Sequence, residues 1–436
     1  MKHTEYGNSL LECTVSYQTP TFAHAKITIP AVLVDDVYNQ AVKSYQRTLQ
    51  TSGFAHAHVP AEYVKQHCKH HLIEHIKEFI YNFFVISFLH NELMRKRIRI
   101  VGQPRLSDLF VEPGQDAIYT FELTAFEPIP FLEWKYFSFK APKRKNYKDL
   151  DRQVETFLEE ELKNKENYPN DGATVNDWVG ASICLVDEQG NQLCSAHNER
   201  IWLKIGDEEA DEPFRNIFAG QQRGQSFVTN ISALQEYFSP SFQSDYQFKV
   251  TVEDIIPHQY FCLDQFKKYF KLKTYKELNQ KLIEVFSYRN DLSLRRSMVH
   301  ESLKLMFAKH RFSVPYHAVL RQQQHVVEVI QNNPDYHVYR AQKDFTDRVR
   351  ELAERQVKEM ILLEQLAFGE ELESTDVDVR GYLSFLQRPR MKEFLYFDSP
   401  VTKVRAQEQP MPDGIIRRRA LHEKSLNHLI HHLAKK

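Results

Sequence analysis

The sequence predicts a multidomain α+β protein with a mixed N-terminal domain, a small central β domain and an all-helical C-terminal domain. The 436-residue chain is long enough for two to four domains of ~100–200 residues each. Strand and helix patterns alternate at first, short strands then follow one another, and helical stripes fill the remainder. Glycine contributes only 13 residues, which favours helix and argues against glycine-rich nucleotide loops.

The N-terminal domain is predicted over residues 1–130. β-branched residues between Leu11 and Ile29 indicate two strands around a turn near Pro20, and a helix follows from Pro30 to near Gly53. A second helical stretch begins at Pro60, and strands are expected over 97–101 and 117–126. One face of that second stretch is apolar at helical spacing: Leu72, Ile76, Phe79, Phe83 and Ile86.

A linker is predicted over 131–148, because Pro128, Pro130, Pro142 and a basic run interrupt any sustained period between Phe126 and Tyr147. The central domain is expected over 149–257. It begins with an acidic helix and continues with four strands, and a turn at 187–190 joins the first two. The predicted strands are Trp178–Val186, Arg200–Ile205, Ser226–Ile231 and Tyr246–Ile255.

The C-terminal domain, 258–436, is expected to be helical, with breaks at proline and asparagine clusters. Most of its apolar stripes must pack against one another as a bundle core. The alternative is that breaks between helices hold some stripes apart and leave them exposed. One such stripe comprises Val338, Ala341, Phe345, Val349 and Leu352.

Composition limits the partners and the compartment. The net charge of −1 gives no overall attraction to nucleic acid or anionic lipid. The five dispersed cysteines form neither a disulfide framework nor a zinc motif, which indicates a reducing compartment. Charged and polar residues interrupt both the N-terminus and the apolar stretch Phe79–Met94, so neither a signal peptide nor a membrane span is expected. We expect a cytoplasmic protein.

The octet Gly53-Phe54-Ala55-His56-Ala57-His58-Val59-Pro60 resembles the ribosome-docking loop of bacterial trigger factors, G-F-R-x-G-x-x-P. The order of the three domains resembles that family as well. The resemblance implies docking near the ribosomal exit tunnel through Gly53, Phe54, His56, His58 and Pro60. The family arginine is Ala55 here and its second glycine is Ala57, so the loop has fewer fixed charges for rRNA phosphate. The alternative is an ordinary loop between two helices.

The central domain resembles the FKBP-type prolyl isomerase fold. The resemblance places Phe214, Phe248 and Tyr237 in the aromatic site that binds an X-Pro peptide and desolvates its amide. Four positions depart from the family: Ser182 and Ile201 replace residues that are usually aromatic, Cys194 replaces a usually acidic residue, and Asp211 replaces an apolar one. A carboxylate in the groove opposes desolvation. We therefore expect weakened isomerase activity, and the alternative is a module that only holds peptide.

Two histidine groups invite a metal interpretation: His67, His71 and His75 beside Cys68, and His422, His428, His431 and His432. Histidines one helical turn apart bind zinc only when a further ligand converges, whereas a solvated helix face requires no such coincidence. We expect neither a metal nor a cofactor, and no nucleophile motif is present.

The resemblance implies an ATP-independent chaperone that binds nascent and unfolded polypeptides at the ribosome. Burial of two or three client side chains would contribute ~1.5–3 kcal/mol each before association costs, which suits weak, reversible holding. The alternatives are a ribosome-independent holdase or scaffold, with a homodimer left open, and a protein that is mainly a prolyl isomerase.

Overall fold

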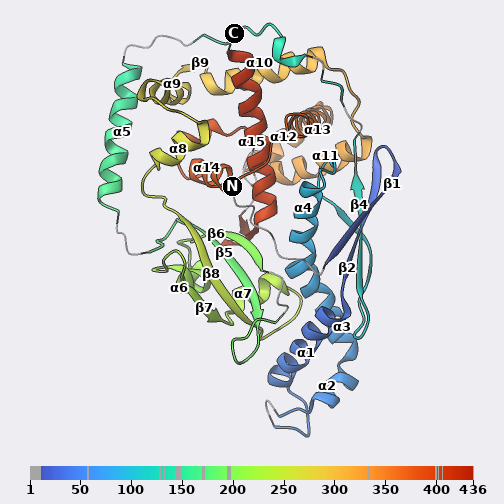
Figure 1. Ribbon diagram of the computed structural model, residues 1–436. Helices are drawn as coiled ribbons and strands as arrows, with labels where there is room; N and C mark the ends of the chain where they lie inside the picture. Colours follow the sequence, from blue (N-terminus) through green and yellow to red (C-terminus); the bar gives the residue numbers. More distant parts are fainter. Residues whose placement is uncertain are drawn as a thin grey trace.

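In the computed structural model, a sheet with its helices, a second sheet and a layer of helices form three adjoining parts (Figure 1). The structure describes residues 11–55, 58–126, 129–131, 133–143, 149–168, 172–193, 198–331, 333–397, 400, 402–404 and 406–435. The predicted multidomain α+β class is confirmed.

The N-terminal sheet is antiparallel, in the order β1-β2-β4-β3, and comprises β1 (Glu12–Thr19), β2 (Phe22–Ile29), β4 (Ala117–Thr124) and β3 (Arg105–Phe110). Alternate residues of β2 and β4 are buried. The helices α1 (Ala31–Thr48) and α3 (Lys69–Ile80) pack together and share one hydrophobic core with these strands. The alternation of apolar residues in these strands therefore specifies which face is buried.

The prediction of a strand over 97–101 is wrong. Only Ile100 makes an isolated bridge, to Ala125, and the third strand is β3 instead. The carbonyl oxygens of Ile100 and Gly102 accept hydrogen bonds from the Arg418 guanidinium, at 2.8 and 2.9 Å. Because a distant helix takes these acceptors, the segment does not extend into a regular ladder.

The second helical stretch is nearly continuous from residue 61 to 95. Its parts are α2 (Ala61–His67), α3, a π-helical turn (Tyr81–Val85) and α4 (Ile86–Arg95). Phe83, Phe84 and Val85 of the π-helical turn are all buried. Apolar side chains that are buried around a helix indicate packing on more than one face.

The central sheet has the order β13-β6-β5-β8-β7 and closely matches the predicted strands: β5 (Trp178–Val186), β6 (Glu199–Lys204), β7 (Ser226–Thr229) and β8 (Gln247–Ile256). The short helices α6 (Glu212–Phe218) and α7 (Ser232–Phe238) lie between its strands in the sequence. Its edge strand β13 (Met411–Pro412) comes from the far end of the chain, where Met411 pairs with Trp202.

The acidic helix α5 (Leu150–Glu166) packs against the helical region rather than the central sheet. The ring of Phe157 lies 5.6 Å from that of Phe286 in α9 (Tyr275–Phe286). The predicted central domain, 149–257, therefore includes a helix that packs against the helical region. The predicted domain boundaries remain a prediction.

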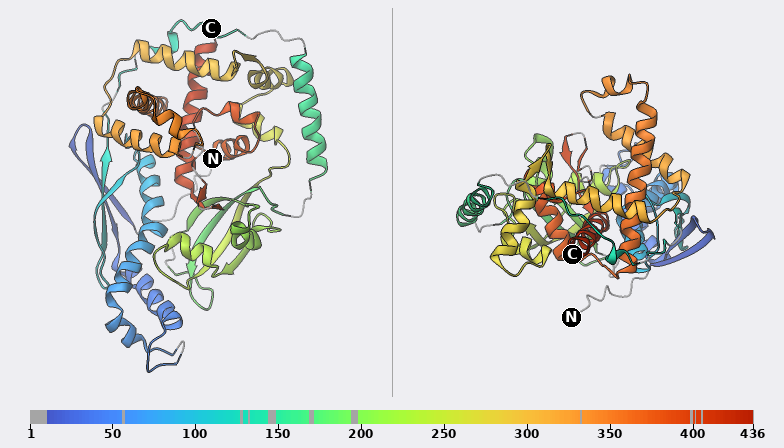
Figure 2. Two further views of the ribbon diagram at one scale, coloured as in Figure 1. Left: turned by 180° about the vertical axis from the view of Figure 1, so that it is seen from behind. Right: turned by 90° about the horizontal axis from the view of Figure 1, so that it is seen from above.

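The helical region surrounds α15 (Asp413–Ala434), which packs against the other helices and against α4 (Figure 1). The helices α11 (Tyr316–Gln331), α12 (Tyr336–Arg340) and α13 (Phe345–Gly369) form a hairpin that projects from the body (Figure 2, right). We call this hairpin the arm. The other helices are α8 (Leu263–Phe270), α10 (Leu294–Lys309) and α14 (Asp376–Leu386). In the described part of the chain, no helix is long and apolar enough to cross a membrane.

Candidate functional site

The loop between α1 and α2 lies at the end of the molecule farthest from the C-terminal helices (Figure 1). Gly53 has φ of +97°, a conformation that favours glycine. The Phe54 side chain is 38% exposed and its ring lies 5.0 Å from that of Tyr63 on α2. The loop therefore presents a supported aromatic side chain to solvent.

The base of this loop is anchored to α1. The carbonyl of Val59 accepts a hydrogen bond from Gln46 at 2.8 Å, and Val59 itself is buried. His58 and Pro60 are exposed, and Pro60 precedes α2 as its N-cap. Of the residues predicted to dock, His56 lies outside the described residues, as does Ala57.

The three aromatic residues predicted to form an isomerase site, Phe214, Phe248 and Tyr237, belong to one hydrophobic core. Phe214 and Phe248 are fully buried, and Tyr237 is half-buried with its ring 4.8 Å from that of Phe238. Burial, with a smaller effect of the Glu199 carboxylate, raises the pKa of the Tyr237 phenol far above its usual value. The rings of Tyr237, Phe238, Phe248 and Tyr246 form a continuous aromatic wall.

An N-terminal helix covers this wall. Phe79 lies 4.5 Å from the ring of Tyr246, and Phe83 lies 4.9 Å from Phe238 and 6.2 Å from Phe248. Both covering rings are fully buried. The sequence placed Phe79 and Phe83 on an apolar face, but it gave no sign that their partners lay more than 150 residues away.

Polar contacts surround the covered wall. The Asn82 amide donates to the carbonyl of Phe238 at 3.1 Å, and the Ser241 hydroxyl donates to Glu78 at 2.7 Å. The Arg47 guanidinium near the end of α1 pairs with Asp245 at 3.0 Å and also with Glu188. These ion pairs lie at the edge of the contact and are partly exposed.

Asp211 does not make the groove polar as predicted. Its carboxylate is buried and accepts hydrogen bonds from the backbone N–H groups of Glu408, at 2.6 Å, and Glu208, at 3.2 Å. It thus anchors a C-terminal segment to the central domain. Ser182 lies in β5 with intermediate exposure, and Cys194 lies outside the described residues.

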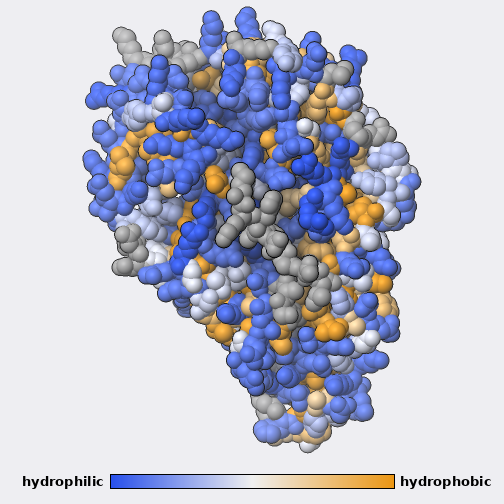
Figure 3. Space-filling model, viewed as in Figure 1, coloured by the Kyte–Doolittle hydropathy of each residue, from blue (hydrophilic) through white to orange (hydrophobic). Residues whose placement is uncertain are grey.

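The arm exposes large apolar side chains on all three of its helices. Tyr316 is 66% exposed and Val338 63%. In the predicted stripe, Val349 is buried, whereas Val338 and Leu352 are exposed. The other exposed large apolar residues of the arm are Leu320, Val329 and Tyr339. On the face shown in Figure 3, apolar surface lies in separate patches among polar side chains.

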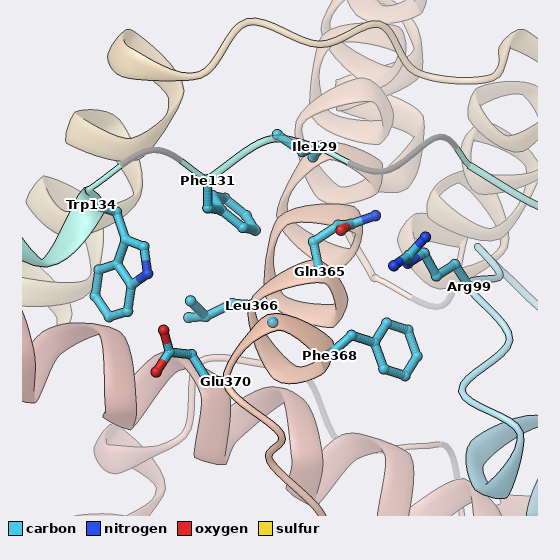
Figure 4. A pocket seen from close by; sticks show the side chains of 9 residues that line it. Arg99, Ile129, Phe131, Trp134, Gln365, Leu366, Phe368 and Glu370 are labelled. Atoms are coloured by element: carbon cyan, nitrogen blue, oxygen red, sulfur yellow. The ribbon is translucent and has the colours of Figure 1, made fainter.

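A cavity of about 310 Å³ lies between Ile129, Phe131 and Trp134 and the C-terminal half of α13 (Figure 4). Phe131 and Trp134 line one side, Phe368 lies on the other, and the charged groups are Arg99 and Glu370.

The histidine groups have protein partners. His67 stacks on Tyr63 with ring centres 4.0 Å apart, His71 is exposed, and His75 is buried. His422 and His428 each lie 3.2 Å from a carboxylate of α13 or its C-cap, Glu364 and Glu370. Within the described ranges, no three His, Cys, Asp or Glu residues converge as a metal site would require.

Comparisons with known proteins agree with this architecture. Residues 12–160 match the family described as bacterial trigger factor protein (TF). The trigger factor of Clostridium kluyveri is 21% identical over 380 residues, covering 81% of this chain and 85% of its own. That of Rickettsia akari is 22% identical over 379 residues, covering 84% of this chain and 82% of its own.

A solved structure titled for substrate recognition by the trigger factor chaperone aligns with 96% of this chain and 99% of its own, at 15% identity and a TM-score of 0.36. This similarity is too low to support the assignment. The family model matches the N-terminal third of the chain and the relatives align over four fifths of it, so the chain resembles trigger factors over most of its length.

Proposed function

We propose that this protein is a cytoplasmic, ATP-independent chaperone of the trigger factor type, which holds unfolded polypeptides on its projecting arm. The observation that carries the proposal is the set of large apolar side chains that the arm exposes, Tyr316, Val338 and Leu352 among them. Isolated apolar side chains are normal on a protein surface, but six on one projecting hairpin offer contacts along an extended partner.

Ribosome association is implied by the family, and we propose that it occurs through the loop between α1 and α2. The loop lies at an end of the molecule, and its aromatic side chain, Phe54, is supported by Tyr63. Phe54 can act as an apolar wedge against rRNA. Nascent chains that emerge beside this loop would then reach the arm.

Isomerase activity is at most a minor part of this proposal. Phe214 and Phe248 are buried, and a helix of the same chain covers the wall that carries Phe248. A peptide must displace that helix before it can reach the wall.

The test is suppression of aggregation. A chemically denatured client is diluted into buffer with each variant, and light scattering is recorded. The triple substitution Tyr316→Ser, Val338→Ser and Leu352→Ser should raise the protein concentration needed for half-protection about tenfold, which corresponds to a total loss of ~1.4 kcal/mol, or ~0.5 kcal/mol for each contact after association costs.

The matched control replaces two exposed apolar residues outside the arm, Val228→Ser and Tyr136→Ser. It should protect as well as the unmodified protein does. Equal protection by the arm variant would refute the assignment of client binding to the arm.

A further inference from the structure

We propose that the cavity at the base of the arm (Figure 4) is a binding site for a small organic anion, a carboxylate attached to an aromatic body. Three separate parts of the chain form it: Arg99 follows α4, Phe131 and Trp134 belong to the segment after the N-terminal sheet, and α13 supplies Phe368. Among the described residues that line the cavity, none belongs to the exposed apolar set of the arm. The inference therefore goes beyond the proposed chaperone function and does not depend on it.

The local backbone directs Arg99 to the cavity. Its neighbours Ile98 and Ile100 both pack on the N-terminal core, and Ile100 makes the bridge to Ala125. Because successive side chains of an extended segment point to opposite sides, Arg99 points away from that core and towards α13 (Figure 4). Its guanidinium lies 6.0 Å from the centre of the Phe368 ring.

This guanidinium has no carboxylate partner among the residues that the structure describes. Arg99 is half-buried, and its Nε is fully buried with no hydrogen-bond acceptor in the described part of the chain. The carboxylate of Glu370, in contrast, accepts a hydrogen bond from Lys135 at 2.5 Å and lies 3.2 Å from the Nε2 of His428. A buried donor without an acceptor is costly, and the planar guanidinium suits a carboxylate. The charges at the cavity therefore favour an anion.

The rest of the lining favours a compact aromatic body. The rings of Phe131, Trp134 and Phe368 line the cavity, and Trp134 and Leu366 are buried. Aromatic rings pair favourably with one another. At about 310 Å³ the cavity lies at the lower end of the ~300–1,000 Å³ that small-molecule sites occupy. This size favours a small molecule over an extended polypeptide.

The probe is 3-(4-bromophenyl)propionate, whose bromine quenches the fluorescence of a tryptophan that it contacts. Of the three tryptophans, Trp134 lines the cavity, whereas Trp178 and Trp202 are buried in a different core. Titration should quench part of the fluorescence with a Kd of about 0.1–1 mM, as expected for a ligand of this size. The quenching should disappear in Trp134→Phe. Quenching that does not saturate, or that persists in Trp134→Phe, would overturn the proposal.

The role of the charge is tested at Arg99, in variants whose fold is checked by circular dichroism. Arg99→Gln should weaken binding of the probe about tenfold, because a charge-assisted hydrogen bond is lost, and Arg99→Lys should weaken it less. The neutral amide of the probe should bind the parent and Arg99→Gln equally weakly. The matched control is Arg105→Gln, which removes an exposed guanidinium from the N-terminal sheet and should leave the affinity unchanged. Equal affinity of the probe for Arg99→Gln and the parent would refute the assignment.

Two further measurements separate this site from client binding. The arm variant used in the aggregation assay should bind the probe as the unmodified protein does, so failure of the chaperone proposal leaves this result unchanged. A short peptide that ends in phenylalanine with a free carboxylate should not compete with the probe. Competition by that peptide at the same concentration would show that the cavity takes the ends of polypeptides, and would contradict the assignment to a small molecule.

Discussion

The buried imidazole of His75 should make the contact between the N-terminal and FKBP-like parts sensitive to acid. His75 is fully buried, and its ring stacks on Phe242 at 5.2 Å. Its Nε2 lies 3.3 Å from the Tyr246 hydroxyl, and its Nδ1 has no hydrogen-bond partner among the residues that the structure describes. Burial lowers the pKa of His75 from 6.5 to about 4, so the native protein holds this side chain neutral.

The sign and the size of the effect follow from this pKa. Between pH 6.5 and pH 4 the unfolded chain binds a proton that the native chain excludes, so the contribution of His75 to stability is complete above pH 6.5 and is lost as the pH falls towards 4. At pH 4.5 the loss is about 2.5 kcal/mol relative to pH 7.5. His75→Phe retains a stacking ring and cannot titrate.

Urea unfolding followed by circular dichroism, at pH 7.5 and at pH 4.5, measures this loss. The substitution also removes the hydrogen bond to Tyr246, which costs about 1 kcal/mol at both pH values and cancels in the comparison. The pH-dependent fall in the free energy of unfolding should be smaller in His75→Phe by about 2.5 kcal/mol. An equal fall in both proteins would show that His75 is not held neutral in the native state, and would refute the reasoning.

Three further predictions concern other parts of the molecule. Turnover of an X-Pro peptide should be weak, and robust catalysis that is lost on Phe214→Ala would contradict the closed site. Replacement of Phe54, His56 and His58 by alanine should abolish cosedimentation with ribosomes in a sucrose gradient, and binding by the unmodified protein should depend only weakly on salt. Unchanged cosedimentation of that variant would place docking elsewhere. Burial raises the pKa of Glu423 from 4.5 to about 7, so its contribution to stability should be lost as the pH rises from 4.5 through 7, by about 3 kcal/mol. Urea unfolding of Glu423→Gln should not show this slope, and an unchanged slope would contradict the assignment.

Local pattern was sufficient to predict most of the strands and helices. The predicted strand Trp178–Val186 coincides with β5, because its apolar run is bounded by clear turn signals. The segment 97–101 alternates basic and apolar residues, but Arg418 binds the carbonyl groups of Ile100 and of Gly102, which follows the segment. Sequence pattern cannot reveal such competition by a side chain more than 300 residues away.

The sequence did not predict the contacts between distant parts of the chain. The apolar face with Phe79 and Phe83 was visible as a helical stripe. Such a stripe predicts that the face is buried, but not which residues it packs against. A second signal was present, because Phe84 and Val85 are apolar on other faces of the same turn, which indicates packing on more than one side. For Asp211 the residue type suggested a solvated carboxylate, but Glu408 supplies a backbone N–H group from the far end of the chain.

The most direct test of client binding by the arm is photo-crosslinking to an unfolded polypeptide. A benzophenone amino acid is placed at Val338 in the arm, or at Val228 in the FKBP-like domain, two positions with similar exposure of 63% and 51%. We predict strong crosslinks from position 338 to the denatured client, weak crosslinks from position 228, and none from either to the same client once folded. Strong crosslinks from position 228 with none from position 338 would contradict the account.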